Sequence, residues 1–454
     1  MSTSPKLTFY GGVGSVTGAN FLLEGGGKKI LVDCGLFQGR RVCDEKNYED
    51  FPYEPKDIDA LIVTHTHIDH IGRIPKLVRD GFKGVIYSTP QTKELAEILL
   101  VDAAHLLAGE AAACGTTPPY EPADVAAAFP LWKGVPYYEP FSIGDFSITL
   151  KDAGHVLGSA LVLATHPTAG TIVFSGDLGN SPSLLLRDTD IVDSASYLVI
   201  ESVYGDRRHE TGEDRTARLE SVINEVAARK GTLLIPAFSV ERSQLVLYEL
   251  HALLKAGRIP RIPVYLDSPL AIKATHIYEH SSDIFNKTAQ ETIARGEKLF
   301  SFPELTLISE KEKSDVLAKV PGPKIIIAGS GMSHGGRVVS HEKHYLSDPK
   351  NALLIVGYQS PGSLGRQLED GAKSVTIGRE KIQVRAQIEK IHGFSGHRDV
   401  DGLLAFVTAT GHTLKKVFVT MGEPRASQFF VQRLRDYLGV DAVYPELGQT
   451  FDLE

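Results

Sequence analysis

The densest group of chemically competent side chains in this sequence lies within the six residues 65–70. They read His-Thr-His-Ile-Asp-His, so three imidazoles and a carboxylate fall within one short stretch. Side chains at positions i and i+2 of an extended chain share one side, so His65 and His67 can bind one ion together. Asp69 and His70 follow where the chain turns, and they can reach a neighbouring position. The spacing predicts two adjacent metal ions.

Imidazole and carboxylate are the ligands expected for zinc or a similar ion, and a site with roughly three protein ligands keeps a position for water. Such a site is typical of catalysis. The alternative is a cluster of polar loop or surface residues, which does not require three histidines at this spacing. We therefore favour a catalytic metal centre.

The same segment lies where a strand passes into a helix. Residues 60–64 are apolar and β-branched, and residues 71–78 continue in a helical pattern. Three further candidates also end or follow predicted strands, namely Asp33, His155 and Asp177. A lone residue in such a place is usually part of a turn. Several of them after neighbouring strands can meet in one site.

The chain has 454 residues, which exceeds what a single core usually supports, so we expect two domains. Its first part contains short strands joined by Gly-rich turns, which predicts hairpins. From about residue 208 strands alternate with helices, which predicts parallel strands with crossover helices. The predicted strands are 6–10, 20–24, 29–33, 60–64, 146–150, 170–174, 232–236, 263–266, 324–328, 352–356 and 416–420, and the predicted helices include 92–105 and 241–254.

Composition is ordinary for a soluble globular protein. The formal net charge of −8 gives no overall basic signature for nucleic acid, although a local basic groove is compatible with it. The sequence shows no apolar run long enough for a bilayer and no secretory signal, so we expect a cytoplasmic protein without a membrane partner. Cys34, Cys43 and Cys114 lack a CxxC spacing and are expected to be thiols.

Beyond these patterns, the HxHxDH segment resembles the signature motif of the metallo-β-lactamase superfamily. More narrowly, the chain is similar to its β-CASP branch of RNA-processing nucleases, through Glu201 in Glu-Ser-Val-Tyr-Gly and His397 in Phe-Ser-Gly-His. The resemblance covers nearly the whole chain. It implies an α/β fold in which an αββα sandwich, residues 1–207 and 386–454, carries an inserted α/β β-CASP domain, residues 208–385.

The resemblance also implies a role for each site residue. One zinc ion would be held by His65, His67 and His155, and a second by Asp69, His70 and a bridging Asp177. The catalytic set would be His397, Glu201 and Asp69. Here His397 is the general acid for the leaving oxygen, and Glu201 orients it and favours its protonated form. Asp33 would anchor a ligand by hydrogen bonding.

Four residues of the inserted domain are candidates for RNA contact: Arg242, Ser330, Gly331 and Arg337. The backbone of a Gly-rich turn can hold phosphate, although most such turns are only turns. Arg242 follows Glu241, so an ion pair at the start of a helix is an equal alternative to a phosphate contact. His334, His341 and His344 are expected to pack or to contact RNA rather than to bind zinc.

One position departs from the family pattern. Met421 stands where a zinc-binding histidine is expected, and a thioether is a poor zinc ligand. The second metal position is therefore expected to be weakened.

The leading hypothesis is a zinc-dependent ribonuclease acting on single-stranded RNA, with endonuclease or exonuclease action and homodimerisation left open. An RNA-binding scaffold with a degenerate metal site is the first alternative. A hydrolase of small esters or thioesters on the same fold is the second.

Overall fold

The computed structural model describes residues 4–38, 44–209, 212–411 and 413–454. The chain forms two compact units, residues 1–208 with 397–454 and residues 209–396. Their first boundary lies one residue beyond the one predicted, but the second lies later than residue 385. The reason is that β19 (Gln387–Lys390) pairs with β16 (Ala352–Ile355), so this segment belongs to the inserted unit.

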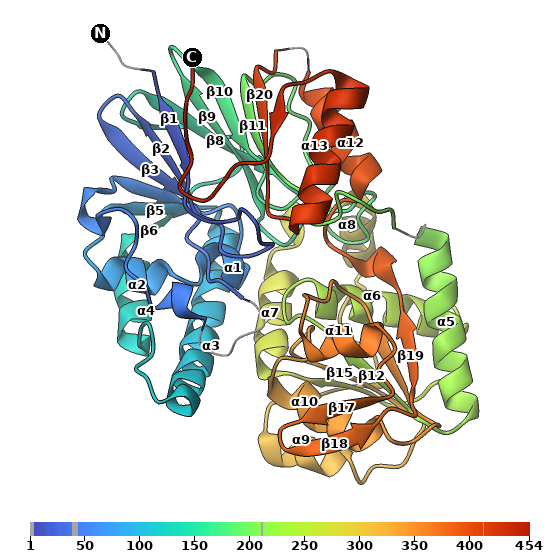
Figure 1. The fold of residues 1–454 in the computed structure, drawn as a ribbon. Coiled ribbons are helices and arrows are strands. Elements are labelled where there is room, and N and C mark those ends of the chain that lie inside the picture. The colour runs from blue at the N-terminus through green and yellow to red at the C-terminus, as the bar shows by residue number, and fades with distance from the viewer. Residues whose placement is uncertain (1–3, 39–43, 210–211, 412) are drawn as a thin grey trace. The chain divides into compact units, whose positions relative to one another are not determined.

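The first unit contains two seven-stranded sheets (Figure 1). The first has the order β22 (Thr450–Asp452), β1 (Lys6–Phe9), β2 (Phe21–Gly25), β3 (Lys28–Val32), β4 (Ala60–Ile62), β5 (Val85–Ser88) and β6 (Trp132–Gly134). The second has the order β21 (Ala442–Val443), β20 (Lys416–Thr420), β11 (Tyr197–Glu201), β10 (Gly170–Phe174), β9 (Ala160–His166), β8 (Phe146–Asp152) and β7 (Phe141–Ile143). The predicted hairpins are confirmed, because β1, β2 and β3 pair antiparallel, as do β8, β9 and β10.

Alternating side chains place three apolar layers around these sheets. Along β2, Phe21 and Leu23 enter the core between the sheets, whereas Leu22 enters a second core beneath helices. Those helices are α1 (Ile68–Ile71), α2 (Ile74–Arg79), α3 (Pro90–Cys114) and α4 (Pro122–Ala128), with the 3₁₀ turns η1 (Glu45–Asn47), η2 (Pro55–Asp57) and η3 (Phe129–Leu131). A third core joins the second sheet to α12 (Val400–Thr410) and α13 (Pro424–Leu438). The predicted αββα sandwich is confirmed.

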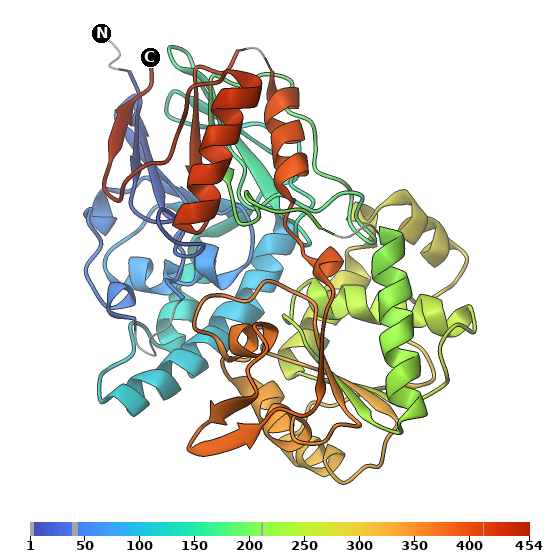
Figure 2. The same ribbon diagram turned by 45° about the vertical axis from the view of Figure 1, so that its right-hand side comes forward.

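The second unit is built on a six-stranded sheet, and every pair in it is parallel. Its order is β14 (Leu305–Leu307), β13 (Val264–Asp267), β15 (Lys324–Ala328), β12 (Thr232–Pro236), β16 and β19. A separate hairpin joins β17 (Ser374–Ile377) to β18 (Glu380–Gln383). The helices are α5 (Gly212–Ala228), α6 (Arg242–Lys255), α7 (Pro269–His280), α8 (Lys287–Ala294), α9 (Lys311–Leu317), α10 (Gly336–Tyr345) and α11 (Leu364–Glu369), with η4 (Ser282–Ile284) and η5 (His392–Phe394). Figure 2 shows α5 and the helices around this sheet. The predicted parallel α/β unit is confirmed.

The cysteines follow the prediction only in part. Cys34 is a free and buried thiol. Cys114, at the end of α3, is disulfide-bonded, so the expectation of a thiol is wrong for this residue. The third cysteine, Cys43, lies outside the described residues. Among the helices described, none combines the length and the apolar character needed to cross a bilayer.

Candidate active site

Loops that follow strands of both sheets carry the candidate residues of the first unit. The segment 65–70 follows β4 and enters α1, as the sequence predicted. Backbone bonds from residues 34–36 to His70 and Ile68 hold α1 in place. The approach is so close that a Cβ on Gly35 would lie 1.5 Å from the carbonyl oxygen of Asp69, so only glycine fits there.

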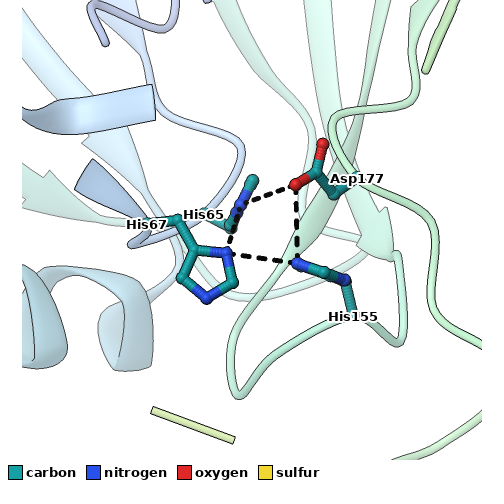
Figure 3. Close-up of side chains that lie close together, drawn as sticks. All are labelled: His65, His67, His155 and Asp177. Atoms are coloured by element: carbon teal, nitrogen blue, oxygen red, sulfur yellow. Dashed lines mark hydrogen bonds and ion pairs between the residues drawn. The ribbon is translucent and has the colours of Figure 1, made fainter. Parts of the chain in front are cut away.

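Three histidines and one aspartate converge in the first cluster (Figure 3). The Nδ1 atom of His67 lies 3.1 Å from Nε2 of His65 and 3.2 Å from Nε2 of His155. One carboxylate oxygen of Asp177, Oδ2, lies 3.3 Å from Nε2 of His65 and 3.5 Å from Nε2 of His155. All four donor atoms lie within 4.8 Å of one another. The structure thus brings together residues that are as many as 112 positions apart in the sequence.

Burial keeps the three imidazoles of this cluster neutral. It lowers the pKa of His65, and it lowers the pKa values of His67 and His155 well below the usual range. A neutral imidazole offers a nitrogen lone pair, which is the form that binds a metal ion. The electrostatics of the cluster therefore favour ligation over proton binding.

A second set of donors lies on the other side of the same carboxylate. Nε2 of His70 lies 3.5 Å from Oδ1 of Asp177 and 3.8 Å from Oδ2 of Asp69. Burial opposes the charged form of His70, but the carboxylates of Asp177, Asp33 and Asp69 together raise its pKa well above the usual range. Asp177 therefore faces both donor sets, one with each oxygen.

Asp33 orients this second set. It is fully buried with φ of 60°, and its Oδ2 lies 2.7 Å from Nδ1 of His70. The same carboxylate accepts hydrogen bonds from the backbone N–H and the hydroxyl of Thr64, both at 2.8 Å. Fixing Nδ1 in this way directs Nε2 of His70 toward Asp69 and Asp177.

The donor set fits metal ions. Nε2 of His70 and Oδ1 of Asp177 are buried polar atoms without a hydrogen-bond partner in the part of the chain that the structure describes. Orphaned buried polar atoms are costly, and they are rare unless something further binds them. Both point into the region between the two donor sets, and imidazole with carboxylate is the chemistry that zinc and related ions prefer.

His397 reaches the same carboxylate from the C-terminal part of the unit. Its Nδ1 lies 3.2 Å from each oxygen of Glu201 and 3.8 Å from Oδ2 of Asp177. A backbone bridge between Gly179 and His397 fixes this approach. Glu201 ends β11, where burial raises its carboxyl pKa against the opposing effect of His397. Its carboxylate also accepts the backbone N–H of Leu178 at 2.7 Å.

Met421 packs as a core residue. It follows β20, it is 2% exposed, and it belongs to the apolar core between the sheets. Its backbone has φ of 45° and donates to the carbonyl of Gly12. A Cβ built on Gly12 would lie 2.7 Å from the Met421 sulfur, so this side chain occupies the space beside Gly12. A small cavity, about the size of one water molecule, separates residues that include Met421 and His70.

In the second unit, Arg337 is engaged within the fold. Its guanidinium lies 2.6 Å from Oδ1 of Asp267 and also donates to the carbonyls of Ile308 and Ser309. His341 lies 2.7 Å from the other oxygen of Asp267. The structure therefore gives Arg337 a position that holds α10 against β13, and it gives His341 the packing role that the sequence favoured.

The other predicted RNA contacts occupy tight local structure. Arg242 begins α6, is 5% exposed, and lies beside the buried Glu241, whose carboxyl pKa burial raises to about 7. Ser330 accepts a backbone hydrogen bond from His334, as a turn residue does. Gly331 lies so close to Phe238 that a Cβ would meet its backbone nitrogen at 2.8 Å. None of these distances involves the residues of the metal cluster.

Two supporting residues were missed by the sequence analysis. The Thr64 hydroxyl lies 3.0 Å from Nδ1 of His65, and the Ser159 hydroxyl accepts the backbone N–H of His155 at 2.9 Å. Thr64 directly precedes the first histidine, which was the available signal for its role. Nothing in the sequence pattern singled out Ser159.

Sequence comparisons agree with this arrangement. Residues 14–203 match the profile of the metallo-beta-lactamase superfamily, residues 243–368 match the Beta-Casp domain, and residues 381–445 match the Zn-dependent metallo-hydrolase RNA specificity domain. The protein named Ribonuclease TTHA0252 from Thermus thermophilus is 38% identical over 399 residues, which cover 88% of this chain and 90% of that relative. The chain is a β-CASP member of the metallo-β-lactamase superfamily.

Other relatives of this β-CASP protein carry the name Transcription termination factor FttA. The protein from Methanosarcina mazei is 31% identical over 93% of this chain and 67% of its own length, and that from Methanocaldococcus jannaschii is 31% identical over 95% and 69%. A crystal structure of a protein of unknown function from Enterococcus faecalis V583 has a TM-score of 0.55 at 13% identity, and 99% of each chain is covered. This last likeness concerns the fold alone.

Proposed function

We propose that this β-CASP protein is a zinc-dependent ribonuclease that hydrolyses phosphodiester bonds of single-stranded RNA. One observation carries the proposal: Asp177 faces the His65–His155 cluster with one oxygen and His70 with the other, and His397 lies beside it. The 38% identity to a protein named as a ribonuclease supports the RNA substrate. An RNA substrate also favours a cytoplasmic location.

In this proposal His65, His67, His155 and Asp177 hold one ion, and Asp69, His70 and Asp177 hold the second. When bound, two such ions supply an activated water at neutral pH and offset the charge that grows on the phosphoryl oxygens. Asp69 belongs to both the metal-binding and the catalytic sets, because burial raises its carboxyl pKa beside His70. Asp33 keeps His70 in the orientation that ligation requires.

His397 supplies the proton for the leaving oxygen. Its Nδ1 faces the buried carboxylate of Glu201, so the proposal assigns proton donation to Nε2. A buried carboxylate favours the imidazolium form and fixes the orientation of the ring. The leaving oxygen of an RNA phosphodiester is a poor leaving group without a proton, which explains why the site needs this pair.

The test combines metal analysis with cleavage of an unstructured RNA by the purified protein. We expect wild type to contain zinc and to cleave. His67→Ala should lose both, whereas His397→Ala should retain zinc and lose roughly 10²- to 10⁴-fold in rate, the usual contribution of a general acid. Full activity of both variants would overturn the proposal. Absence of metal after zinc-replete purification would favour an RNA-binding scaffold, and faster turnover of a thioester than of RNA would favour a small-substrate hydrolase.

A further inference from the structure

One face of α13 carries cationic and aromatic side chains in alternation. Arg425, Phe429, Arg433 and Tyr437 follow one another at intervals of four residues, and such positions share one face of a helix. Phe429 is 40% exposed and Tyr437 is 67% exposed, although large aromatic side chains are mostly buried in this protein. We call these four residues the α13 ladder.

The rungs of the α13 ladder contact one another. The guanidinium carbon of Arg433 lies 5.1 Å from the ring centre of Phe429 and 5.0 Å from that of Tyr437. Both distances are typical of cation–π contacts. No ion pair holds Arg425 or Arg433 among the residues described. The ladder therefore presents two π surfaces and two cations whose charge no acidic side chain offsets.

The opposite face of α13 fixes the direction of the ladder. Phe430 and Leu434 are fully buried in the core beneath the second sheet. Near the start of the helix, the hydroxyl of Ser427 lies 2.8 Å from that of Ser202, the neighbour of Glu201. The ladder thus begins beside the strand end that holds the general-acid pair, and its Arg425–Tyr437 span extends for about 18 Å along the helix.

We propose that the α13 ladder binds single-stranded RNA, with bases stacked on Phe429 and Tyr437 and phosphates near Arg425 and Arg433. This inference rests on the proposed function and names a substrate-binding surface for it. Aromatic rings joined by arginine side chains are the chemistry with which proteins bind unpaired bases. Paired bases of a duplex are already stacked and do not offer their faces to such rings. Uncompensated cations favour a polyanion over an apolar protein surface.

The test measures binding of a fluorescein-labelled oligouridylate by fluorescence anisotropy. All variants carry His397→Ala, so that the RNA stays intact, and their melting temperatures are compared with that of the parent. The ladder variant is Phe429→Ala/Tyr437→Ala. The matched control is Val101→Ala/Leu106→Ala, which removes two exposed apolar side chains from α3 of the same unit. A second probe is an abasic oligonucleotide with the same phosphates.

We expect the ladder variant to bind the oligouridylate roughly tenfold or more weakly, since each stacked base contributes substantially, while the control keeps the parent affinity. On the abasic probe the ladder variant and the parent should bind alike. Tyr437→Phe should bind as the parent does, because it keeps the ring. If alanine variants fail to fold, Phe429→Leu/Tyr437→Leu serves instead, since leucine keeps apolar bulk without a π face.

Equal affinity of the ladder variant and the parent for the oligouridylate would overturn the inference. Loss of self-association by the ladder variant without loss of RNA affinity would overturn it too, and would make the ladder a contact between protein chains. Wild-type cleavage of RNA distinguishes this failure from failure of the proposed function. A protein that cleaves no RNA but binds it through the ladder would leave the ladder standing and remove the nuclease.

Discussion

Nδ1 of His70 lies 2.7 Å from the carboxylate of Asp33, at a position where Asp33 adopts a left-handed backbone. Asparagine tolerates that conformation, so Asp33→Asn changes the charge and the hydrogen bonding but not the backbone. We expect metal affinity at the second position to fall roughly 10- to 100-fold, with the first ion retained. Metal content after dialysis against graded chelator measures this.

The control for Asp33→Asn is Asp59→Asn, which removes a carboxylate of the same unit that contacts Lys28 at 2.6 Å. It should keep both ions. Two retained ions in Asp33→Asn would show that Asp33 does not support ligation by His70.

Glu201 and His397 are predicted to act as one unit. Glu201→Gln should lower RNA cleavage by about 10- to 100-fold with unchanged metal content, because the amide cannot favour an imidazolium as a carboxylate does. A nitrophenyl phosphodiester has a leaving group that needs no proton. Its hydrolysis should therefore be far less sensitive to Glu201→Gln and to His397→Ala. Equal losses on both substrates would argue against proton donation by His397.

Met421→His tests the departure at the second metal position. We expect the second ion to bind at least about tenfold more tightly, because imidazole is a better zinc ligand than a thioether. The variant should also melt at a lower temperature, since Met421 belongs to the core. Met421→Leu, which keeps the apolar side chain, controls for packing and should leave metal content unchanged. Unaltered metal binding in Met421→His would show that position 421 does not reach the site.

Buried Glu342 predicts a pH-dependent stability in the inserted unit. Burial raises its carboxyl pKa to about 7, while the Ser333 hydroxyl donates to it and lowers the pKa in part. The folded state therefore holds a proton that the unfolded state releases above pH of about 4.5, so stability falls as pH rises from there to about 7. The loss above pH 7 is of order 3 kcal/mol.

Glu342→Gln should remove this dependence, and it should raise the melting temperature at pH 8 more than at pH 5. The exposed Glu312→Gln is the control and should follow wild type at both pH values. Parallel shifts of Glu342→Gln and wild type with pH would contradict the assignment.

Local patterns were enough to predict the strand-to-helix segment at 65–70, the hairpins of the first unit and the parallel strands of the second. Each depends on residues that are close in sequence. The engagement of Arg337 could not be predicted, because its partner Asp267 is 70 positions away. The second domain boundary was placed too early because the pairing of β19 with β16 has no local signature. The disulfide at Cys114 was missed for the same reason.

The first unit closes only through its last strands: β20 pairs with β11 in the middle of one sheet, and β22 pairs with β1 in the other. A nascent chain therefore cannot assemble this sandwich before residues 416–452 have left the ribosome. His397 also emerges only after the whole inserted unit, which can fold beforehand on its own parallel sheet. Assembly of the catalytic groups is consequently a late, post-synthetic event, and unfinished chains should be inert toward the messages that encode them.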